Sequence, residues 1–221
     1  MPRSSRGAFD RPALAALVVV RGLSGSGKTD VLHALAARGE QVLDLEALAV
    51  HRGSAFGRIG LAAPPPSRRA FAAAVAAVVA GADPARALWI EEEGDFLGRA
   101  SVPGWLTAAA ATAVAVDLRA PRPARVARIA AAYADARPAD LLAALTRCAP
   151  RLGAGVAAAA GARIEAGDYA GAVAILLPAY DRAYRHRAAR CIPAAASFEV
   201  GGLTPAAVAA RLRGWARCHD R

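Results

Sequence analysis

The stretch "GLSGSGKT", from Gly22 to Thr29, decides the fold of this chain. It fits the pattern G-x-x-x-x-G-K-[ST], in which glycines let the backbone turn tightly so that its N–H groups surround a phosphate. Lys28 is the single lysine among the 28 Lys and Arg residues of the sequence. The loop accommodates a compact ammonium group, whereas the planar guanidinium group of arginine is too wide. The stretch therefore predicts a phosphate-binding loop (P-loop).

The segments on either side of the loop support this prediction. Before it, "ALAALVVV" (Ala13–Val20) has the continuous apolar character of a buried strand. After it, "TDVLHALAARG" (Thr29–Gly39) predicts a helix, because Val31, Leu32 and Leu35 fall on one face and a glycine follows its last turn. Strand, glycine loop and helix are the arrangement that a P-loop requires.

Further strands alternate with helical patterns along the chain. Ser67 is a predicted N-cap for a helix that runs to Ala80, and Thr204-Pro205 opens the last helix. Because helices separate the strands, we expect an α/β fold with a doubly wound parallel sheet in the order 2-3-1-4-5. The other predicted strands are Gln41–Glu46, Ala87–Glu93, Ala113–Leu118 and Ala196–Val200.

The length of 221 residues predicts one sizeable domain. We interpret residues 1–12 as a flexible leader and residues 13–221 as a single P-loop α/β domain, with a helical insertion at about 120–190 that forms a lid or C-terminal helical region. No apolar run reaches the roughly 18 residues of a membrane span. The first apolar run leads directly into the P-loop, so we read it as a strand rather than a signal peptide and expect a cytoplasmic protein.

The net charge of +10 and the pI of about 10.8 favour a polyanionic partner such as RNA. The sequence contains no recognisable RNA-binding motif, and only 5% of its residues are aromatic. The three cysteines, Cys148, Cys191 and Cys218, are widely spaced and form no C-x-x-C pair. This pattern argues against a disulfide framework and against a zinc site.

Acidic residues follow the strand "ALWIEEE" (Ala87–Glu93) and lie at the edge of the sheet where a ligand is expected. An acid at the end of such a strand holds Mg²⁺, together with the hydroxyl of the P-loop threonine. Thr29, Glu91 and Glu92 are therefore the predicted Mg²⁺ ligands. The alternative is a solvated acidic turn.

A second block of polar residues follows the next strand. Asp44 is a candidate to orient an acceptor or bind a metal, or alternatively to cap a helix at Glu46–Val50. His51 and Arg52 lie on a glycine-rich loop with Ser54, and Arg52 is suited to clamp a phosphate through two hydrogen bonds. We predict that Asp44, His51 and Arg52 join Lys28 as catalytic residues.

Arginines recur at a spacing of three after the fourth predicted strand. On a helix this spacing places Arg119, Arg122, Arg125 and Arg128 on one face, as in a lid that closes over phosphates. Arg122 and Arg125 are the predicted phosphate contacts. The alternative is a solvated helix face.

The stretch "LLPAYDRAYRHR" (Leu176–Arg187) mixes aromatic and basic side chains. Tyr180, Arg182, Tyr184 and Arg185 are predicted to bind RNA, because tyrosines stack on bases and arginines neutralise phosphates. The alternative is an amphipathic helix with buried tyrosines.

Together, several stretches resemble the P-loop domain of bacterial tRNA 2-selenouridine synthase over roughly residues 15–190. The most specific is "QVLDLEALAVHRGSAFG", in which a strand ending in "DLE" is followed by "HRGSAFG". The other matching stretches are "GLSGSGKT", "ALWIEEE" with "LGR", "VP" before a helix, "RLG" at Arg151–Gly153, and "LLPAYDRAY".

The resemblance implies a role in tRNA modification. Members of that family replace the sulfur of wobble 2-thiouridine with selenium from selenophosphate, after geranylation of the sulfur from geranyl diphosphate. The P-loop, consisting of Gly22, Ser24, Gly25, Ser26, Gly27, Lys28 and Thr29, would then hold a diphosphate and stabilise it as it leaves. Asp44, Glu46, His51, Arg52 and Ser54 match the second block of the family.

The sequence departs from the family pattern at two points. The family carries an N-terminal rhodanese domain with an essential cysteine, and this chain reaches its P-loop some twenty residues after Met1. We therefore expect a separate rhodanese-type partner. Where the family reads close to "EDESR", this chain reads "EEEGD" (Glu91–Asp95), which replaces a cation by an anion.

We therefore expect a transferase that modifies tRNA, with Mg²⁺ and either a nucleoside triphosphate or geranyl diphosphate in the P-loop, and without membrane attachment. Two alternatives remain open. One is an ATP-dependent small-molecule kinase, which would transfer phosphate without tRNA. The other is a non-catalytic subunit that binds a nucleotide or RNA, which the "EEEGD" departure favours.

Overall fold

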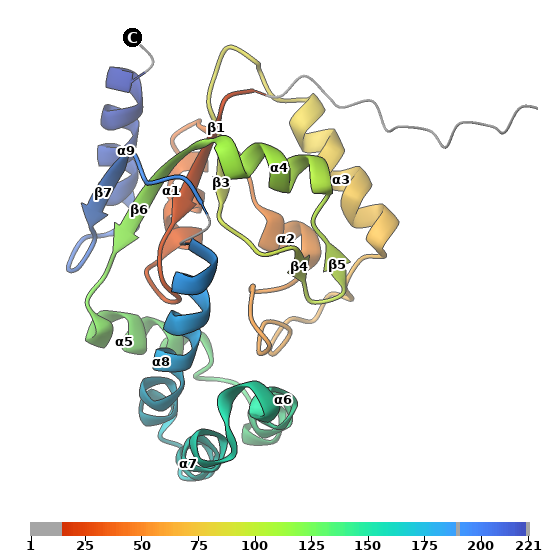
Figure 1. Ribbon diagram of the computed structural model, residues 1–221, viewed down its shortest axis with the longest axis vertical. Coiled ribbons are helices and arrows are strands. Elements are labelled where there is room, and N and C mark those ends of the chain that lie inside the picture. Colours follow the sequence, from red (N-terminus) through yellow and green to blue (C-terminus); the bar gives the residue numbers. More distant parts are fainter. Residues whose placement is uncertain (1–14, 189–190, 220–221) are drawn as a thin grey trace, which may run out of the picture.

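A five-stranded parallel sheet organises the molecule (Figure 1). The computed structural model describes residues 15–188 and 191–219, so the leader predicted for residues 1–12 lies outside the described residues. The sheet has the order β2–β3–β1–β6–β7, which confirms the predicted order of the five strands. They are β1 (Leu17–Arg21), β2 (Gln41–Leu43), β3 (Leu88–Glu91), β6 (Val114–Arg119) and β7 (Ala196–Glu199).

Helices cover both faces of the sheet, and a separate group of helices extends from one end (Figure 1). Helices α1 and α9 pack together on one face, and α3 and α4 cover the other. Helices α5–α8 form the helical region. The helices are α1 (Lys28–Ala36), α2 (Leu45–Ala49), α3 (Arg68–Ala80), α4 (Gly104–Thr112), α5 (Arg122–Ala132), α6 (Pro138–Leu152), α7 (Ala154–Glu165), α8 (Tyr169–Ala188) and α9 (Pro205–His219).

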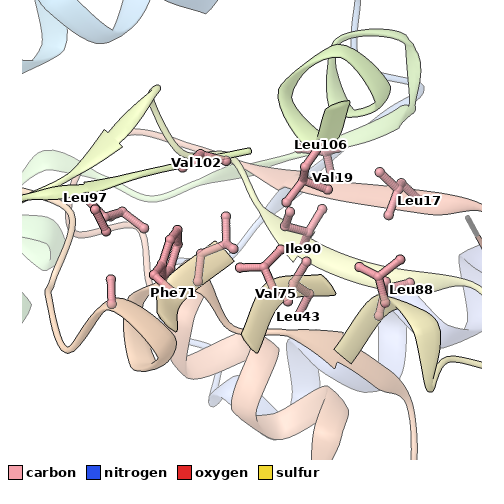
Figure 2. Close-up of a cluster of buried hydrophobic side chains, with 14 of the residues drawn as sticks. Leu17, Val19, Leu43, Phe71, Val75, Leu88, Ile90, Leu97, Val102 and Leu106 are labelled. Atoms are coloured by element: carbon pink, nitrogen blue, oxygen red, sulfur yellow. The ribbon is translucent and has the colours of Figure 1, made fainter. Parts of the chain in front are cut away.

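Strand β1 is buried on both faces, because its side chains alternate between two apolar cores. Val18 and Val20 pack with residues of α1 and α9, whereas Leu17 and Val19 belong to the core under α3 and α4. Figure 2 shows this second core, in which Phe71 of α3 lies close to the side chains of the sheet. The continuous apolar run before the P-loop is therefore explained by burial on both sides.

The second predicted strand is shorter than Gln41–Glu46. It ends at Leu43, because the carboxylate of Asp44 accepts a hydrogen bond from Ala47 N at 2.8 Å and starts α2. An aspartate that caps a helix in this way competes with the extended conformation. The N-caps predicted at Ser67 and Thr204 are confirmed, since their hydroxyls accept from Ala70 N and Ala207 N.

Two further features differ from the expectations. A small antiparallel hairpin, β4 (Phe96–Leu97) and β5 (Ala100–Ser101), follows the acidic residues after β3. Arg119 lies in β6, so the four arginines at spacing three do not share one helix. The strand continues further than the sequence indicated because β7 pairs with β6 up to Arg119.

The helical region has an apolar core of its own, separate from the two cores of the sheet. Leu141 and Leu145 of α6 pack there with Ile164 of α7 and Leu176 of α8. Phe56, from the loop after α2, joins the same cluster. The "HRGSAFG" loop is thus anchored to the helical region. Among the described residues, no helix is both long enough and apolar enough to cross a membrane.

Phe71 and Phe96 give a matched test of the core under α3. Phe71 is fully buried and Phe96 is 62% exposed. We expect Phe71→Ala to lower the free energy of unfolding by about 3–5 kcal/mol, because it removes a buried ring and leaves a cavity. Phe96→Ala should change it by less than about 0.5 kcal/mol. Urea unfolding followed by circular dichroism measures both, and equal losses would contradict the assignment of Phe71 to the core.

Candidate phosphate- and metal-binding site

The P-loop connects the end of β1 to the start of α1 and packs against α5. Gly25 has a φ of +78°, and a Cβ there would lie 2.8 Å from the carbonyl oxygen of Arg125. Only glycine fits this position without strain or displacement of the backbone. Ser26 N donates to Leu23 O at 3.0 Å, which closes the turn. The loop amides thus precede the N-terminus of α1, where a helix favours negative charge.

Lys28, Thr29 and Glu91 come together beside the loop. Lys28 Nζ donates to Gly22 O at 2.9 Å and lies 3.3 Å from Glu91 Oε1. Thr29 Oγ1 donates to the other carboxylate oxygen of Glu91 at 2.8 Å. A lysine, a hydroxyl and a strand-end carboxylate in mutual contact are the groups that hold Mg²⁺ and phosphate in P-loop proteins.

Two more carboxylates complete an acidic cluster of Glu46, Glu91 and Glu93, whose nearest ligand atoms lie within 4.8 Å of one another. Glu46 Oε2 is 3.4 Å from Thr29 Oγ1. Glu92, one of the two predicted Mg²⁺ ligands from this strand, does not belong to this cluster, and its Oε1 lies 3.7 Å from Cys191 Sγ. Glu91 contacts Lys28 and Thr29, whereas its neighbour Glu92 contacts Tyr184 and Cys191.

The first glycine of "HRGSAFG", Gly53, allows the acidic cluster to form. Gly53 has a φ of +63°, and a Cβ there would lie 2.6 Å from Glu46 Oε1 and 3.3 Å from Glu93 Oε1. The three acids lie close together, and this affects their protonation. Burial, and then the charges of Glu91 and Glu93, raise the pKa of Glu46 to about 8. A proton or a cation is therefore needed to balance the cluster near neutral pH.

The other residues predicted as catalytic are placed around this cluster rather than within it. Both carboxylate oxygens of Asp44 are engaged, one by Ala47 N and the other by His33 Nε2 at 2.7 Å. The imidazole of His51 is buried against Gly57 and Gly98, and burial followed by the charge of Arg58 lowers its pKa. Their catalytic roles remain predictions.

Arg52 links the same loop to the helical region. Its guanidinium group donates to Ala132 O at 3.1 Å and lies over the ring of Tyr133, 5.7 Å from the ring centroid. Burial is the main cause that raises the pKa of Tyr133, although Ser54 and Arg52 oppose the shift. Arg52 is exposed and thus accessible to a ligand at the junction between the loop and α5.

The arginines of α5 have different environments. Arg125 is only 3% exposed, and its guanidinium group binds Asp181 through two hydrogen bonds and Ser24 O through a third at 2.8 Å. This placement argues against the predicted phosphate contact by Arg125, because the buried Asp181 already holds it. Arg122 donates to Ala174 O at 2.6 Å. The guanidinium group of Arg128 reaches the P-loop and donates to Gly25 O at 2.5 Å.

The predicted RNA-binding residues of α8 divide into two pairs. Arg182 and Arg185 are exposed. Tyr184 Oη instead accepts a hydrogen bond from Gly22 N at 2.8 Å, and Tyr180 lines an apolar pocket. Burial and the neighbouring carboxylate of Glu92 raise the pKa of Tyr184. The tyrosines are therefore mostly buried, which was the alternative to base stacking.

The apolar pocket opens beside the P-loop and occupies about 650 Å³, its open mouth included. Ser24 of the P-loop and Ser54 lie at its polar side. Its walls come from the helical region and are almost entirely apolar. They include Ile129, Tyr133, Leu141, Leu176, Leu177 and Tyr180.

The sequence prediction missed several residues of this site. The sequence indicates Glu46 only through its match to the second block of the family, and Glu93 only as part of an acidic run. Arg128 has the same spacing as Arg122 and Arg125, so the helical period could not single it out. Asp181 gave no signal of its own, because its partner Arg125 is 56 residues away.

Comparison with known proteins agrees with these features. A family model described as "tRNA 2-selenouridine synthase AAA domain" matches residues 15–151. The tRNA 2-selenouridine synthase of Cupriavidus necator is 42% identical over 126 residues, which are 57% of this chain and 33% of that protein. The synthase of Shewanella loihica is 34% identical over 122 residues, 55% of this chain and 32% of that protein.

The chain spans about a third of the length of these curated relatives. Among solved structures, TT1252 from Thermus thermophilus aligns with a TM-score of 0.42 and 19% identity, over 92% of this chain and 98% of that chain. The family match covers more than half of the 221 residues and includes the P-loop, the "HRGSAFG" loop and the acidic cluster. The chain belongs to the tRNA 2-selenouridine synthase AAA-domain family.

Proposed function

We propose that this protein is a transferase that modifies tRNA by attaching a geranyl group to the sulfur of wobble 2-thiouridine. The family assignment supports a role in tRNA modification. The apolar pocket beside the P-loop is the observation that favours geranyl diphosphate as the ligand. A ligand with a diphosphate head and a hydrocarbon tail matches this pairing of a charged loop with an apolar wall, whereas the polar ribose of a nucleotide does not.

The P-loop holds the diphosphate in this proposal. The loop amides and Lys28 bind its oxygens. The half-buried Arg128 contacts the P-loop at Gly25 O, and the exposed Arg52 lies where the "HRGSAFG" loop meets α5. Thr29 and Glu91, with Glu46 beside them, have the oxygen ligands that suit Mg²⁺. When bound, Mg²⁺ would neutralise charge on the diphosphate.

The reaction that fits these groups is a displacement. The sulfur of 2-thiouridine forms a bond to C1 of the geranyl group, the bond from C1 to oxygen breaks, and inorganic diphosphate leaves with the electron pair. The base loses its N3 proton to the released diphosphate or to water. Lys28 and the loop amides stabilise the negative charge on the leaving diphosphate, which lowers the barrier.

Replacement of the geranylated sulfur by selenium from selenophosphate is the second half of the proposed activity. We propose that a separate rhodanese-type protein takes part in it. Of the three cysteines, Cys148 of α6 is buried, Cys191 beside Glu92 is half-buried, and Cys218 of α9 is exposed. The tRNA itself is expected to contact the exposed Arg182 and Arg185 of α8.

The direct test supplies the purified chain with tRNA that contains 2-thiouridine, geranyl diphosphate and Mg²⁺, and identifies the nucleosides by mass spectrometry. We expect a geranylated nucleoside, and a loss of roughly 100-fold or more in its rate of formation with Lys28→Ala, because the main cation at the leaving group is removed. Phosphate transfer from ATP to a small molecule would instead favour the kinase alternative. Binding of tRNA with no product would favour a non-catalytic subunit.

A second test asks whether the apolar pocket holds the geranyl tail. Ala130 lines the pocket, and Ala127 is exposed on the same helix. We expect Ala130→Phe to weaken binding of geranyl diphosphate by roughly tenfold or more, since each buried methylene contributes about 0.8 kcal/mol. Binding of inorganic diphosphate should not change. Isothermal titration calorimetry measures both ligands, with Ala127→Phe as the control, and equal losses for both ligands would contradict this role.

The raised pKa of Glu46 predicts a pH dependence of stability in the absence of metal. Unfolded Glu46 loses its proton near pH 4.5, whereas folded Glu46 keeps it up to about pH 8. The folded state therefore binds more protons between these values, and its stability falls as the pH rises through this window. We expect Glu46→Gln to remove this part of the decline.

Urea unfolding in EDTA at several pH values measures the effect. The variant Glu165→Gln changes an exposed glutamate of α7 and is the control. If the difference in unfolding free energy between wild type and Glu46→Gln stays constant between pH 5 and pH 8, Glu46 has an ordinary pKa and the cluster does not form as described.

A further inference from the structure

A second cavity lies on the other side of Glu91, between the carboxyl ends of β1 and β3 and helix α4. We call it the β3–α4 cavity. It occupies about 1120 Å³, its open mouth included. Glu91, which contacts Lys28 and Thr29, also lines this cavity. The cavity therefore borders the phosphate site directly, and none of the roles proposed above uses it.

The floor of the β3–α4 cavity is apolar, and part of it is made of alanine side chains. Val19 and Ile90 come from the sheet, and Figure 2 shows them in the core beneath Leu106 of α4. Further along α4, Ala110 and Ala111 line the cavity. Because alanine side chains are short, they leave space between this helix and the sheet. Such a floor suits a flat ring rather than a branched chain.

The rim of the cavity is polar and negatively charged. Glu92, Glu93 and Asp95 lie on it. Arg21 also lines the cavity, but its guanidinium group lies 3.1 Å from Asp117 Oδ1 and donates to Ile192 O at 2.8 Å. The excess of carboxylates disfavours phosphate groups, and the charges disfavour a hydrocarbon tail. A neutral ring that carries an N–H donor fits both the rim and the floor.

Glu92 is the acceptor that stands out on this rim. Its carboxylate is hydrogen-bonded to Tyr184 and its Oε1 atom contacts Cys191, whereas its buried Oε2 atom has no hydrogen-bond partner among the described residues. An ionised carboxylate only accepts hydrogen bonds, and a buried oxygen without a donor is unfavourable. An N–H group of a ligand in the cavity would satisfy this oxygen. Glu92 is thus placed for a role other than the metal contact predicted from the sequence.

We propose that the β3–α4 cavity receives the pyrimidine base that is modified, with its N–H group donated to Glu92 and its ring packed against the apolar floor. This inference rests on the proposed function, because the base is the acceptor of that reaction. A base in a single-stranded loop can leave its stack and enter such a cavity. The base then approaches Glu91 from the β3–α4 cavity, and the diphosphate approaches it from the P-loop.

The test separates recognition of the base from catalysis. A fluorescently labelled anticodon stem–loop with 2-thiouridine at the wobble position is compared with the same RNA that lacks this base. We expect the wild-type chain to bind the RNA with the base roughly tenfold more tightly, which is the scale of packing one base against a protein. Fluorescence anisotropy gives both affinities without any turnover.

Two matched variants then locate the base. Ala110→Leu fills the cavity, and Ala108→Leu adds the same side chain at an exposed position of α4. We expect Ala110→Leu to remove the preference for the base-containing RNA and to leave the affinity for the other RNA unchanged. Ala108→Leu should keep the preference. A preference that survives in Ala110→Leu, or a wild-type chain that binds both RNAs equally, would overturn this inference.

The proposed function is tested separately by the formation of geranylated nucleoside. Geranylation by a wild-type chain that shows no preference for the base would leave the function standing and refute the cavity as the base site. Failure to bind either RNA would refute the role in tRNA modification, and with it the acceptor on which this inference depends.

Discussion

The pairing of β1 with β3 is the constraint on which the site depends. The register sets Val20 opposite Glu91, so the last residue of β3 lies beside the start of the P-loop. Lys28 and Thr29 then meet Glu91 without any further adjustment of the backbone. A shift of one residue would turn this carboxylate to the opposite face of the sheet. Both strands are buried along their whole length, so Glu91 is held at a buried position beside the loop.

The helical region is tied to the P-loop by polar contacts that lie within the protein. Arg125 is held between Asp181 of α8 and Ser24 O of the loop. One turn further along α8, Tyr184 Oη accepts a hydrogen bond from Gly22 N, the first amide of the P-loop. Helices α5 and α8 supply much of the apolar pocket, so the elements that position the P-loop also form the wall of this pocket. If Arg125 or Asp181 were lost, the other would be left as an uncompensated buried charge. The position of the P-loop and the shape of the apolar pocket therefore depend on the same ion pair.

The acidic cluster concentrates negative charge next to a loop that is built to hold an anion. Glu46, Glu91 and Glu93 approach one another from three different segments, and Lys28 offsets part of their charge. A divalent cation would balance the negative charge of the cluster. The departure "EEEGD" adds acid at the rim of the β3–α4 cavity rather than at the P-loop.

The sequence by itself determined the P-loop, the parallel α/β fold, the strand order and the family, because these depend on local patterns and short motifs. It also pointed to Glu91, since a strand-end acid has a fixed place relative to the loop. Only the tertiary structure showed that Glu91 contacts Lys28 and Thr29, and that Asp181 holds Arg125. It also showed that Glu46, rather than Asp44, contacts Thr29, and that Tyr180 and Tyr184 face inward. The physical reason is distance along the chain: Asp181 and Arg125, or Glu46 and Glu93, become neighbours only after separate elements pack, and no local pattern records which face of an element its partner will cover.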